Sequence, residues 1–249
     1  MYIIGDIGNT EIKLSLLNSK FDKIKNLKLK TQLINPRYLN KKMKNIKRYF
    51  PIIKSCLFCS VVPTSYIKFK TYFKKYSKIK CFELKKQNIK NLIKIKVNKN
   101  QVGSDRIANA IGALDNKNNF IIIDFGTATT FDVIKKNTYM GGIIAPGIEI
   151  SLDNLVTKAS LIPRIKFTKT KKIIGLNTIS SVRSGFYWGY VGLINKLVEL
   201  IKTDTKLNYK IVLTGGLSHL FKNSLKVKST IDKEITLNGL IKTLKFIKI

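Results

Sequence analysis

The chain contains two copies of one short pattern, an apolar run that ends in Asp-x-Gly and continues into small hydroxyl or amide residues. The first copy covers residues 3–10 and the second covers residues 122–129, so that the two aspartates lie 118 residues apart. The β-branched residues of each run favour a buried strand that ends at the aspartate. Because the spacing is about one domain length, it indicates two similar domains with a nucleotide gripped between them.

Each copy has the chemistry of an anion-binding turn. The strand delivers the carboxylate of Asp6 or Asp124 to the edge of a sheet, and the glycine two residues later lets a phosphate approach closely. Thr10 and Thr127 place hydroxyls beside exposed backbone N–H groups, and Lys13 follows on the next strand. An ordinary hairpin is the alternative for either copy alone, but two copies in matching strand contexts favour a phosphate site.

Composition indicates a globular protein. The 249 residues are 44% hydrophobic, which suffices for one large or two modest domains. The longest apolar stretches are interrupted well before the roughly 18 residues that a membrane-spanning helix needs, and the amino terminus lacks the pattern of a signal peptide. We therefore expect a cytoplasmic protein.

The net charge of +33 comes mainly from scattered lysines. Only five of the 47 basic residues are arginines, and the lysines occur in every segment beside abundant Ile and Asn, as an AT-rich genome would encode them. A specific nucleic-acid-binding protein instead gathers its basic residues on one face. Specific nucleic-acid binding is therefore not expected, while nonspecific polyanion binding by the Lys-rich stretches stays open.

The cysteine pattern argues against a disulfide framework. Cys56, Cys59 and Cys81 make an odd count, which fits a reducing compartment. The first two have the spacing of a zinc or redox pair, but a second pair is missing, so we expect them to be small buried residues of an apolar strand.

A third acidic position stands outside the repeat. Gly103-Ser-Asp-Arg106 opens a segment whose small and apolar residues recur at helical spacing. Ser104 or Asp105 can simply cap this helix. Arg106 offers a fork for an anion and Gly103 allows close approach of a substrate, so Asp105 is also a candidate base for phosphoryl transfer to an alcohol.

The polar turn at 116–119 leads at once into the second Asp-x-Gly strand, and we place the domain boundary there, between domains 1–117 and 118–249. Helices are expected at 36–49, 64–76, 102–114, 149–158 and 178–203, and strands at 2–6, 11–17, 27–33, 56–62, 79–84, 120–125, 129–135, 138–145 and 210–214.

Six motifs occur in the order found in type III pantothenate kinases, which this chain resembles. They are Asp6-Ile-Gly-Asn-Thr-x-x-Lys13, Ser60-Val-Val-Pro63, Gly103-Ser-Asp-Arg106, Asp124-Phe-Gly-Thr-Ala-Thr129, Gly141-Gly-x-Ile-x-Pro-Gly147 and Ile174-Gly-x-Asn-Thr178. The resemblance continues to Gly215-Gly216 and so covers nearly the whole chain. It implies an α/β fold of two ribonuclease-H-like domains with mixed sheets flanked by helices, as in sugar kinases, chaperone ATPases and actin, with ATP in the cleft between the domains.

The resemblance also implies an activity, the ATP-dependent phosphorylation of pantothenate to 4′-phosphopantothenate, which is the first step toward coenzyme A. The family's general base falls on Asp105, and its other pantothenate contacts fall on Gly103, Ser104, Arg106 and Thr178. Its ATP contacts fall on Thr127 and on the first loop, namely Asp6, Ile7, Gly8, Asn9, Thr10, Glu11, Ile12 and Lys13. Asp6 would orient Mg²⁺ through water, and Asp124 matches the ligand for a monovalent cation, K⁺ or ammonium.

Members of this family act as homodimers. Our candidate for the dimer surface is the helix at 178–203, which carries Phe186, Tyr187, Trp188 and Tyr190. Packing of these aromatic residues in the core is the alternative.

One position departs from the family. A tyrosine usually stands seven residues before the glycine of Gly-x-Asp-Arg, and here that position is Lys96, or Val97 if one residue is deleted. Neither reproduces an aromatic wall, which puts substrate affinity in question more than reaction type. The motif's usual alanine is also replaced, by Ser104. Two other functions stay open: a nonenzymatic regulatory or nucleic-acid-binding accessory protein on the same scaffold, and a kinase for another small alcohol.

Overall fold

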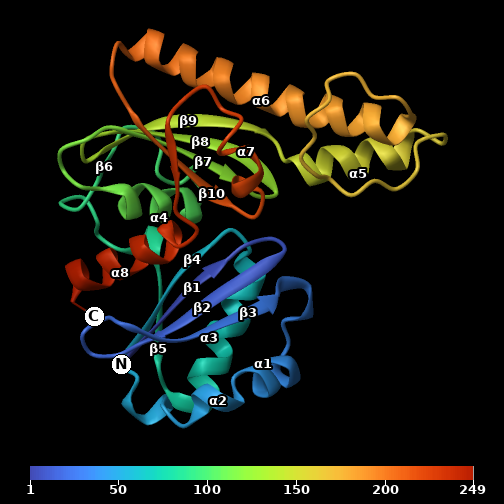
Figure 1. Cartoon of the computed structure of the whole chain (residues 1–249). Coiled ribbons are helices and arrows are strands. Elements are labelled where there is room, and N and C mark those ends of the chain that lie inside the picture. The colour runs from blue at the N-terminus through green and yellow to red at the C-terminus, as the bar shows by residue number, and fades with distance from the viewer. Residues whose placement is uncertain (249) are drawn as a thin grey trace. The chain divides into compact units, whose positions relative to one another are not determined.

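The computed structural model describes residues 1–248. The chain divides into two compact units, which are drawn together in Figure 1 and are described separately below. The first unit comprises Met1–Leu114, Asn137–Tyr139 and Glu234–Ile249, and the second comprises Asp115–Lys136 and Met140–Lys233. The first change of unit, after Leu114, lies close to the boundary expected near residue 117. The expectation that all later residues belong to the second domain is wrong, because the segment from Glu234 onward belongs to the first unit.

The first unit is built on a five-stranded mixed sheet with the order β3-β2-β1-β4-β5. Its strands are β1 (Tyr2–Ile7), β2 (Glu11–Leu17), β3 (Lys23–Lys30), β4 (Ser55–Ser60) and β5 (Lys80–Glu83). The strands β1, β2 and β3 form an antiparallel meander, while β4 pairs in parallel with β1 and β5 in parallel with β4. The carboxyl ends of β1, β4 and β5 consequently meet at one edge of the sheet.

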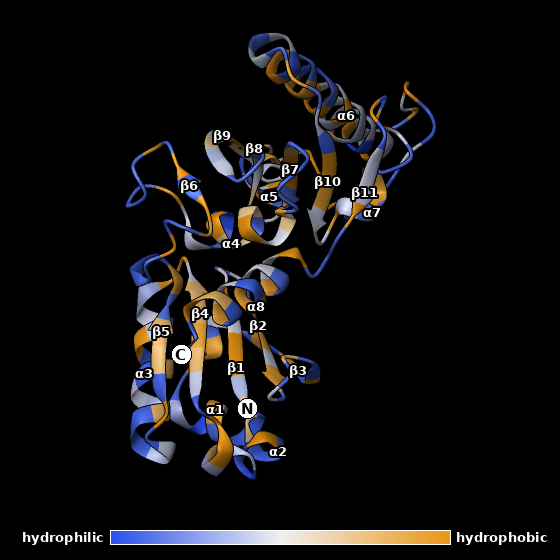
Figure 2. Cartoon of the chain, turned by 90° about the vertical axis from the view of Figure 1, so that its left-hand side faces the viewer, coloured by the Kyte–Doolittle hydropathy of each residue, from blue (hydrophilic) through white to orange (hydrophobic). Residues whose placement is uncertain are grey.

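Side chains alternate between the two faces of this sheet. On one face Ile3, Ile7 and Phe58 join a core with Phe69 and Phe73 of α3 (Pro63–Ser77), beside the short helices α1 (Pro36–Lys42) and α2 (Lys44–Lys47). The other face of β1 and β4 contacts α4 (Ser104–Ala113) and α8 (Ile235–Ile247). Figure 2 shows hydrophobic colour along β1 and β4, as expected for strands covered on both faces.

The second unit contains the duplicated strand. Its strands are β7 (Phe120–Phe125), β8 (Ala128–Lys135), β9 (Thr138–Pro146), β10 (Lys210–Gly215) and β11 (Ser229–Ile231), in the sheet order β11-β10-β7-β8-β9. The first two residues of β9, Thr138 and Tyr139, belong to the first unit and pair there in parallel with the short strand β6 (Lys94–Ile95). As in the first unit, an Asp-x-Gly strand sits in mid-sheet, with an antiparallel hairpin partner on one side and a parallel strand on the other.

Helices of the second unit are α5 (Ile148–Lys158), α6 (Thr178–Thr205) and the single turn α7 (Ser218–Phe221). Tyr187, Ile194 and Val198 of α6 enter a core with Phe125 of β7 and Phe221 of α7. Among residues 1–248 the structure has no helix with both the length and the apolar character to cross a membrane.

The short elements β6, α7 and β11 were not expected from the sequence, and three longer elements also differ from the expectation. The helix expected at 36–49 is split at Met43 into α1 and α2, and the strand expected at 27–33 begins earlier, at Lys23, and ends at Lys30. The last helix, α8, was not expected at all. Its apolar residues do recur at helical spacing, but Gly239 stands in the middle of the segment, where glycine normally weakens a helix.

Candidate active site

The first Asp-x-Gly motif forms the turn between β1 and β2. Gly8 N donates to Glu11 O at 3.1 Å and closes the turn. Thr31 braces it from outside, since Thr31 Oγ1 donates to Gly8 O at 2.7 Å and Thr31 N donates to Thr10 O at 3.1 Å. The tip residues Asn9 and Thr10 remain exposed and, with Lys30 and Gln32, line a cavity of about 280 Å³. The loop is thus held in shape while its tip is left open to a ligand.

Asp6 and Lys13 lie directly opposite each other on β1 and β2, so both side chains project from the same face of the sheet. The other neighbour of Asp6 in the sheet is Cys59 of β4, whose Sγ donates to Asp6 Oδ1 at 3.5 Å. Burial, together with the negative charge of Asp6, raises the pKa of the Cys59 thiol, which therefore stays protonated and able to donate.

Some residues of the predicted ATP loop have side chains that a ligand cannot reach. Ile7 and Ile12 are fully buried in the core, so only their backbone is available to a ligand. Glu11 is turned aside toward Lys28, with Lys28 Nζ 3.6 Å from Glu11 Oε1. The remaining polar groups of the loop are Asp6, Lys13 and the tip.

The motif Gly103-Ser-Asp-Arg106 forms the start of α4. Asp105 lies in the first turn, and its Oδ1 accepts a hydrogen bond from Arg106 N at 2.8 Å. A Cβ on Gly103 would come within 2.4 Å of Asp105 Oδ1, so only glycine leaves this carboxylate its position. The helix capping considered as the alternative is not present, because the N-cap is Gly103 and neither Ser104 nor Asp105 makes a side-chain cap hydrogen bond.

The electrostatic environment of Asp105 is mixed. Burial raises the pKa of this carboxyl above its ordinary value, while the N–H and the charge of Arg106, and more weakly the charge of Lys85, act to lower it. A carboxylate with a raised pKa is a better proton acceptor than one in water, provided that it is ionised at the working pH.

One residue that the sequence analysis did not single out, Glu83, helps to hold this region together. Ser104 Oγ donates to Glu83 Oε1 at 2.6 Å, which ties the first residue of α4 to the end of β5. The negative charges of Asp6, Asp105 and Glu83 all raise the pKa of Cys59. The structure therefore brings the predicted base Asp105 and the predicted metal-orienting Asp6 to the same side of one sheet, around the Cys59 thiol.

The last helix, α8, packs closely against α4 and holds it in position. Gly239 and Gly112 let the two backbones touch, since a Cβ on Gly239 would lie 1.9 Å from Ala108 O. Thr236 Oγ1 donates to Asn109 Oδ1 at 2.7 Å.

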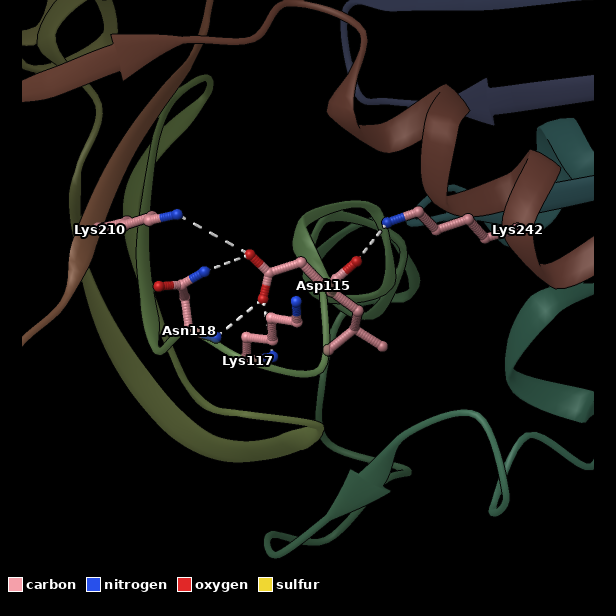
Figure 3. Close-up of polar contacts among 6 residues, drawn as sticks. Asp115, Lys117, Asn118, Lys210 and Lys242 are labelled. Carbon is pink, nitrogen blue, oxygen red and sulfur yellow. Dashed lines mark hydrogen bonds and ion pairs between the residues drawn. The ribbon is translucent and has the colours of Figure 1, made fainter.

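Lys242 completes this contact at the far end of α4. Its Nζ donates to Gly112 O and Leu114 O, both at 2.7 Å, and so satisfies carbonyls that the end of the helix leaves open. Figure 3 shows the Lys242 side chain reaching this end of the helix. The same figure shows Asp115 at the start of the second unit, where Asn118 and Lys210 hold its carboxylate.

The second Asp-x-Gly motif forms the turn between β7 and β8. Gly126 N donates to Ala128 O at 3.1 Å, and Gly126 and Thr127 are exposed at the tip. Two distant glycines approach this turn. A Cβ on Gly215, whose φ is +85°, would lie 2.6 Å from Asp124 Oδ1, and a Cβ on Gly147 would lie 2.1 Å from Thr127 O. Both glycines of the later motifs thus keep space free around Asp124 and Thr127.

The last predicted contact residue, Thr178, is the first residue of α6 and is exposed. Asn177 caps this helix in a capping box with Ser180, which fixes where the helix begins. Lys96, at the position of the family's tyrosine, is exposed, and so is Val97. No aromatic side chain is therefore supplied by either residue.

The aromatic residues of α6 pack mainly within the second unit. Tyr187 is fully buried and donates to Leu220 O at 3.1 Å, and Tyr190 donates to Pro146 O at 2.9 Å. Phe186 and Trp188 are partly buried against the same core. Core packing, the alternative considered for these residues, accounts for Tyr187 in full and for the others in part.

The carboxylates of the two Asp-x-Gly turns fit a metal ion that is held partly by the protein and partly by the phosphates of a substrate. In the described part of the chain, no group of three or more His, Cys, Asp and Glu side chains is arranged to hold a metal ion. Mg²⁺ in phosphoryl-transfer enzymes is commonly held by one or two carboxylates together with substrate phosphates, and Asp6 offers such a carboxylate. Gly215 brings its backbone close to Asp124 Oδ1 and Phe125 O, since a Cβ there would lie 2.6 and 2.5 Å from these oxygens, and such oxygens are the ligand type that hard cations prefer.

Comparison with solved structures supports the fold. A candidate 2-dehydro-3-deoxygalactonokinase from Sinorhizobium meliloti superposes with a TM-score of 0.64 at 9% identity, covering 99% of both chains. A candidate transcriptional activator of the Baf family from Campylobacter jejuni gives a TM-score of 0.59 at 16% identity, covering 98% of both chains. At these identities the likeness shows the fold alone. The α/β fold class predicted from the sequence is thus confirmed.

Sequence comparison is more specific. A type III pantothenate kinase from Pelagibacter ubique is 58% identical over 248 residues, which cover 100% of this chain and 100% of that protein. The sequence profile described as type III pantothenate kinase matches residues 2–200. On these two findings, the chain belongs to the type III pantothenate kinase family.

Proposed function

We propose that this chain transfers the γ-phosphoryl group of ATP to the primary hydroxyl of pantothenate, with Asp105 as the general base. The hydroxyl oxygen forms a bond to the γ-phosphorus as the bond from that phosphorus to the β,γ-bridging oxygen breaks. Asp105 takes the hydroxyl proton, and the products are 4′-phosphopantothenate and ADP. The observation that carries the proposal is the raised pKa of a carboxylate held at the start of α4 on the same side of the sheet as Asp6.

The first loop is proposed to hold the triphosphate. Its exposed tip at Asn9 and Thr10 opens to a cavity, and its backbone is braced by Thr31. Lys13 stands across from Asp6 and supplies a positive charge for the phosphates. Because transfer of a phosphoryl group is catalysed mainly by position and charge, a rigid loop with one ammonium and one carboxylate is a suitable frame. Ile7, Glu11 and Ile12 would contribute backbone groups only.

Metal ions are proposed at the two Asp-x-Gly turns. Family membership implies ATP with a divalent metal, and we assign Mg²⁺ to Asp6, acting through water. A monovalent cation, K⁺ or ammonium, is assigned to Asp124, where glycines leave space around the carboxylate. Both ions would neutralise phosphate charge. Thr127, at the exposed tip of the second turn, is the proposed ATP contact of that unit.

Pantothenate is proposed to contact the start of α4. Gly103 and Ser104 frame Asp105, and Arg106 offers a guanidinium to the substrate's carboxylate. Thr178 at the exposed start of α6 is assigned the remaining contact.

The test is an ADP-release assay with and without pantothenate in Mg²⁺ at two K⁺ concentrations. Asp105→Asn should lower kcat by roughly 10²–10⁴-fold, the usual contribution of a general base, while the circular dichroism spectrum stays unchanged. Asp153→Asn, a change of an exposed carboxylate on α5, is the matched control. Unchanged turnover in Asp105→Asn would refute the assignment. Sequence-selective DNA binding without pantothenate-dependent ADP release would instead favour an accessory protein.

We also propose a homodimer formed through the second unit. The segment before α6 exposes large apolar side chains, with Leu161 91%, Ile174 77% and Leu176 81% exposed. Gly185, Gly189 and Gly192 of α6 face open space. Apolar side chains gathered on one exposed segment are typical of a protein interface.

Sedimentation velocity tests the dimer. The unaltered chain should sediment as a dimer and the double variant Ile174→Asp/Leu176→Asp as a monomer. Ile52→Asp, at an exposed isoleucine of the first unit, should leave the dimer intact. A monomeric wild type, or a variant that stays dimeric, would contradict the proposed interface.

A further inference from the structure

A second cavity lies in the first unit, and its lining contains none of the residues predicted to touch ATP or pantothenate, although the charge of its residue Lys85 does reach Asp105. It has a volume of about 730 Å³ and is formed by the segment 85–99, which includes the short strand β6. Its lining comprises three isoleucines, three carboxamide side chains and five lysines, Lys85, Lys86, Lys90, Lys94 and Lys99. None of residues 6–13 or 103–106 belongs to it. The volume lies within the range of small-molecule sites in proteins.

The positive charge of this cavity is compensated only in part, by the carboxylates of Glu83 and Asp105 outside its lining. Its lining contains no carboxylate, and within residues 1–248 none of the five lysines forms an ion pair with one. Lys85 Nζ donates to Asn100 O at 2.9 Å and Lys99 Nζ donates to Gln87 O at 3.1 Å. Both acceptors are neutral carbonyls, which orient the ammonium groups without cancelling their charge. An anion would supply the missing counter-charge.

Two of these lysines differ from the scattered surface lysines of the chain. Lys85 and Lys99 are half-buried, whereas lysines are normally left in water. Burial lowers the pKa of Lys99, and the neighbouring charges of Lys85 and Lys90 lower it further, against the opposing charge of Glu83. Codon bias explains why lysines are abundant, but it does not explain why five of them line one cavity and two of these are half-buried.

The remainder of the lining selects an organic ligand. Ile95 is half-buried and offers an apolar surface above the buried Ile89 and Ile93, while the carboxamides Gln87, Asn88 and Asn91 can donate and accept hydrogen bonds. A single carboxylate would need one ammonium partner, and five ammonium groups suit the multiple oxygens and charge of a phosphate. We propose that this cavity binds a phosphorylated organic anion at a site separate from those of ATP and pantothenate.

Pyridoxal 5′-phosphate is a suitable probe because it carries a phosphate on an apolar ring, and its aldehyde condenses with a lysine amine to form an imine and water. Reduction with borohydride converts the imine into a stable secondary amine, and peptide mass spectrometry then identifies the labelled lysine. At less than one equivalent, the label should concentrate on Lys85 and Lys99. Inorganic pyrophosphate should protect them, and pyridoxal without its phosphate should label without preference. Labelling spread over all exposed lysines would overturn the proposal.

Two double variants test whether the lysines of the cavity are responsible for the preferred labelling. Lys90→Gln/Lys94→Gln removes two ammonium groups at exposed positions of the cavity and should lower the labelling of Lys85 and Lys99 by about tenfold, the scale expected when charge-assisted hydrogen bonds are lost. Lys41→Gln/Lys44→Gln makes the same change of charge at exposed positions on α1 and α2 and should leave labelling unchanged. Equal labelling in the two double variants would refute a built site.

A non-hydrolysable ATP analogue with Mg²⁺ distinguishes the cavity from the nucleotide site. Labelling of Lys85 and Lys99 should persist when the analogue is saturating, and its loss would show that the cavity is part of the ATP site. The labelling needs no turnover, so the outcome is independent of whether the chain phosphorylates pantothenate.

Discussion

Ser104 Oγ donates a hydrogen bond of 2.6 Å to Glu83 Oε1, and this bond joins the first residue of α4 to the end of β5. Ser104 is buried and Asp105 follows it directly, so the bond sets the position of the proposed base. The serine that replaces the family's usual alanine thus has a defined partner in this chain. Glu83 becomes a positioning residue, which acts on the reaction through Ser104.

We predict that Glu83→Gln and Ser104→Ala each lower kcat several-fold while leaving the KM for ATP unchanged. Ser104→Ala removes the charge-assisted hydrogen bond, worth about 1.5–3 kcal/mol, and Glu83→Gln reduces it to a weaker neutral one, at the helix that carries Asp105. Because both act on one bond, the double variant should lose little more than either single variant, as steady-state kinetics can measure. Losses that simply add would contradict a shared positioning role. Asp153→Asn again controls for the loss of a carboxylate.

The acid limb of the pH–rate profile should respond to Lys85. A general base must be ionised, and the positive charge of Lys85 lowers the pKa of Asp105. Lys85→Gln removes that charge, so the pKa of Asp105 rises and the acid limb of kcat/KM moves to higher pH. Lys80→Gln, at an exposed lysine of β5, should leave the profile in place. A limb that stays fixed or moves to lower pH in Lys85→Gln would argue against Asp105 as the titrating base.

Asp105→Asn should increase thermal stability at neutral pH although it abolishes activity. Burial raises the folded-state pKa of Asp105 above 3.8, so the ionised carboxylate costs stability at every pH above that raised value. Below 3.8 the carboxyl is protonated in both the folded and the unfolded state and the cost disappears. The gain in Tm should therefore be present at pH 7 and shrink as the pH falls, which calorimetry at several pH values can follow. A gain that does not depend on pH would have another origin.

The contact between α4 and α8 should tolerate no side chain at Gly239. A Cβ there would lie 1.9 Å from Ala108 O, so Gly239→Ala must force the helices apart. We expect the free energy of unfolding to fall by about 1–3 kcal/mol, as for an overpacked core, and kcat to fall because α4 carries Asp105. Gly216→Ala, where a Cβ meets nothing within 4 Å, should change the stability by less than about 0.5 kcal/mol. Urea denaturation of the two variants provides the measurement.

Local pattern was sufficient for the strands that carry the two motifs. The apolar runs before Asp6 and Asp124 form β1 and β7, and each is followed by a hairpin as the alternation of residues predicted. These features depend on residues close in sequence, whose backbone preferences and burial pattern agree. The helix after Gly103 was predicted on the same basis, and its small residues now have a purpose, since Gly112 lets α8 approach.

Several parts of the site could not have been predicted in this way. Glu83 stands 21 residues from Ser104, and nothing in either segment names the other as its partner. Cys59 was expected only as a buried core residue, and it is buried, but its place beside Asp6 follows from the parallel pairing of β1 and β4. Lys242 and Thr236 belong to a helix that the sequence analysis did not anticipate and had left within the second domain.

The sequence by itself determined the two Asp-x-Gly turns, the family and the identity of the proposed base, because each rests on residues that are neighbours in the chain. The tertiary structure alone decided what surrounds Asp105 and what charge it carries. Burial, the bond from Ser104 to Glu83 and the packing of α8 are set by segments brought together only when the sheet and its helices form. The pKa of a carboxyl group depends on the burial and the charges that these segments create around it. The position of Asp105 in the sequence does not reveal them.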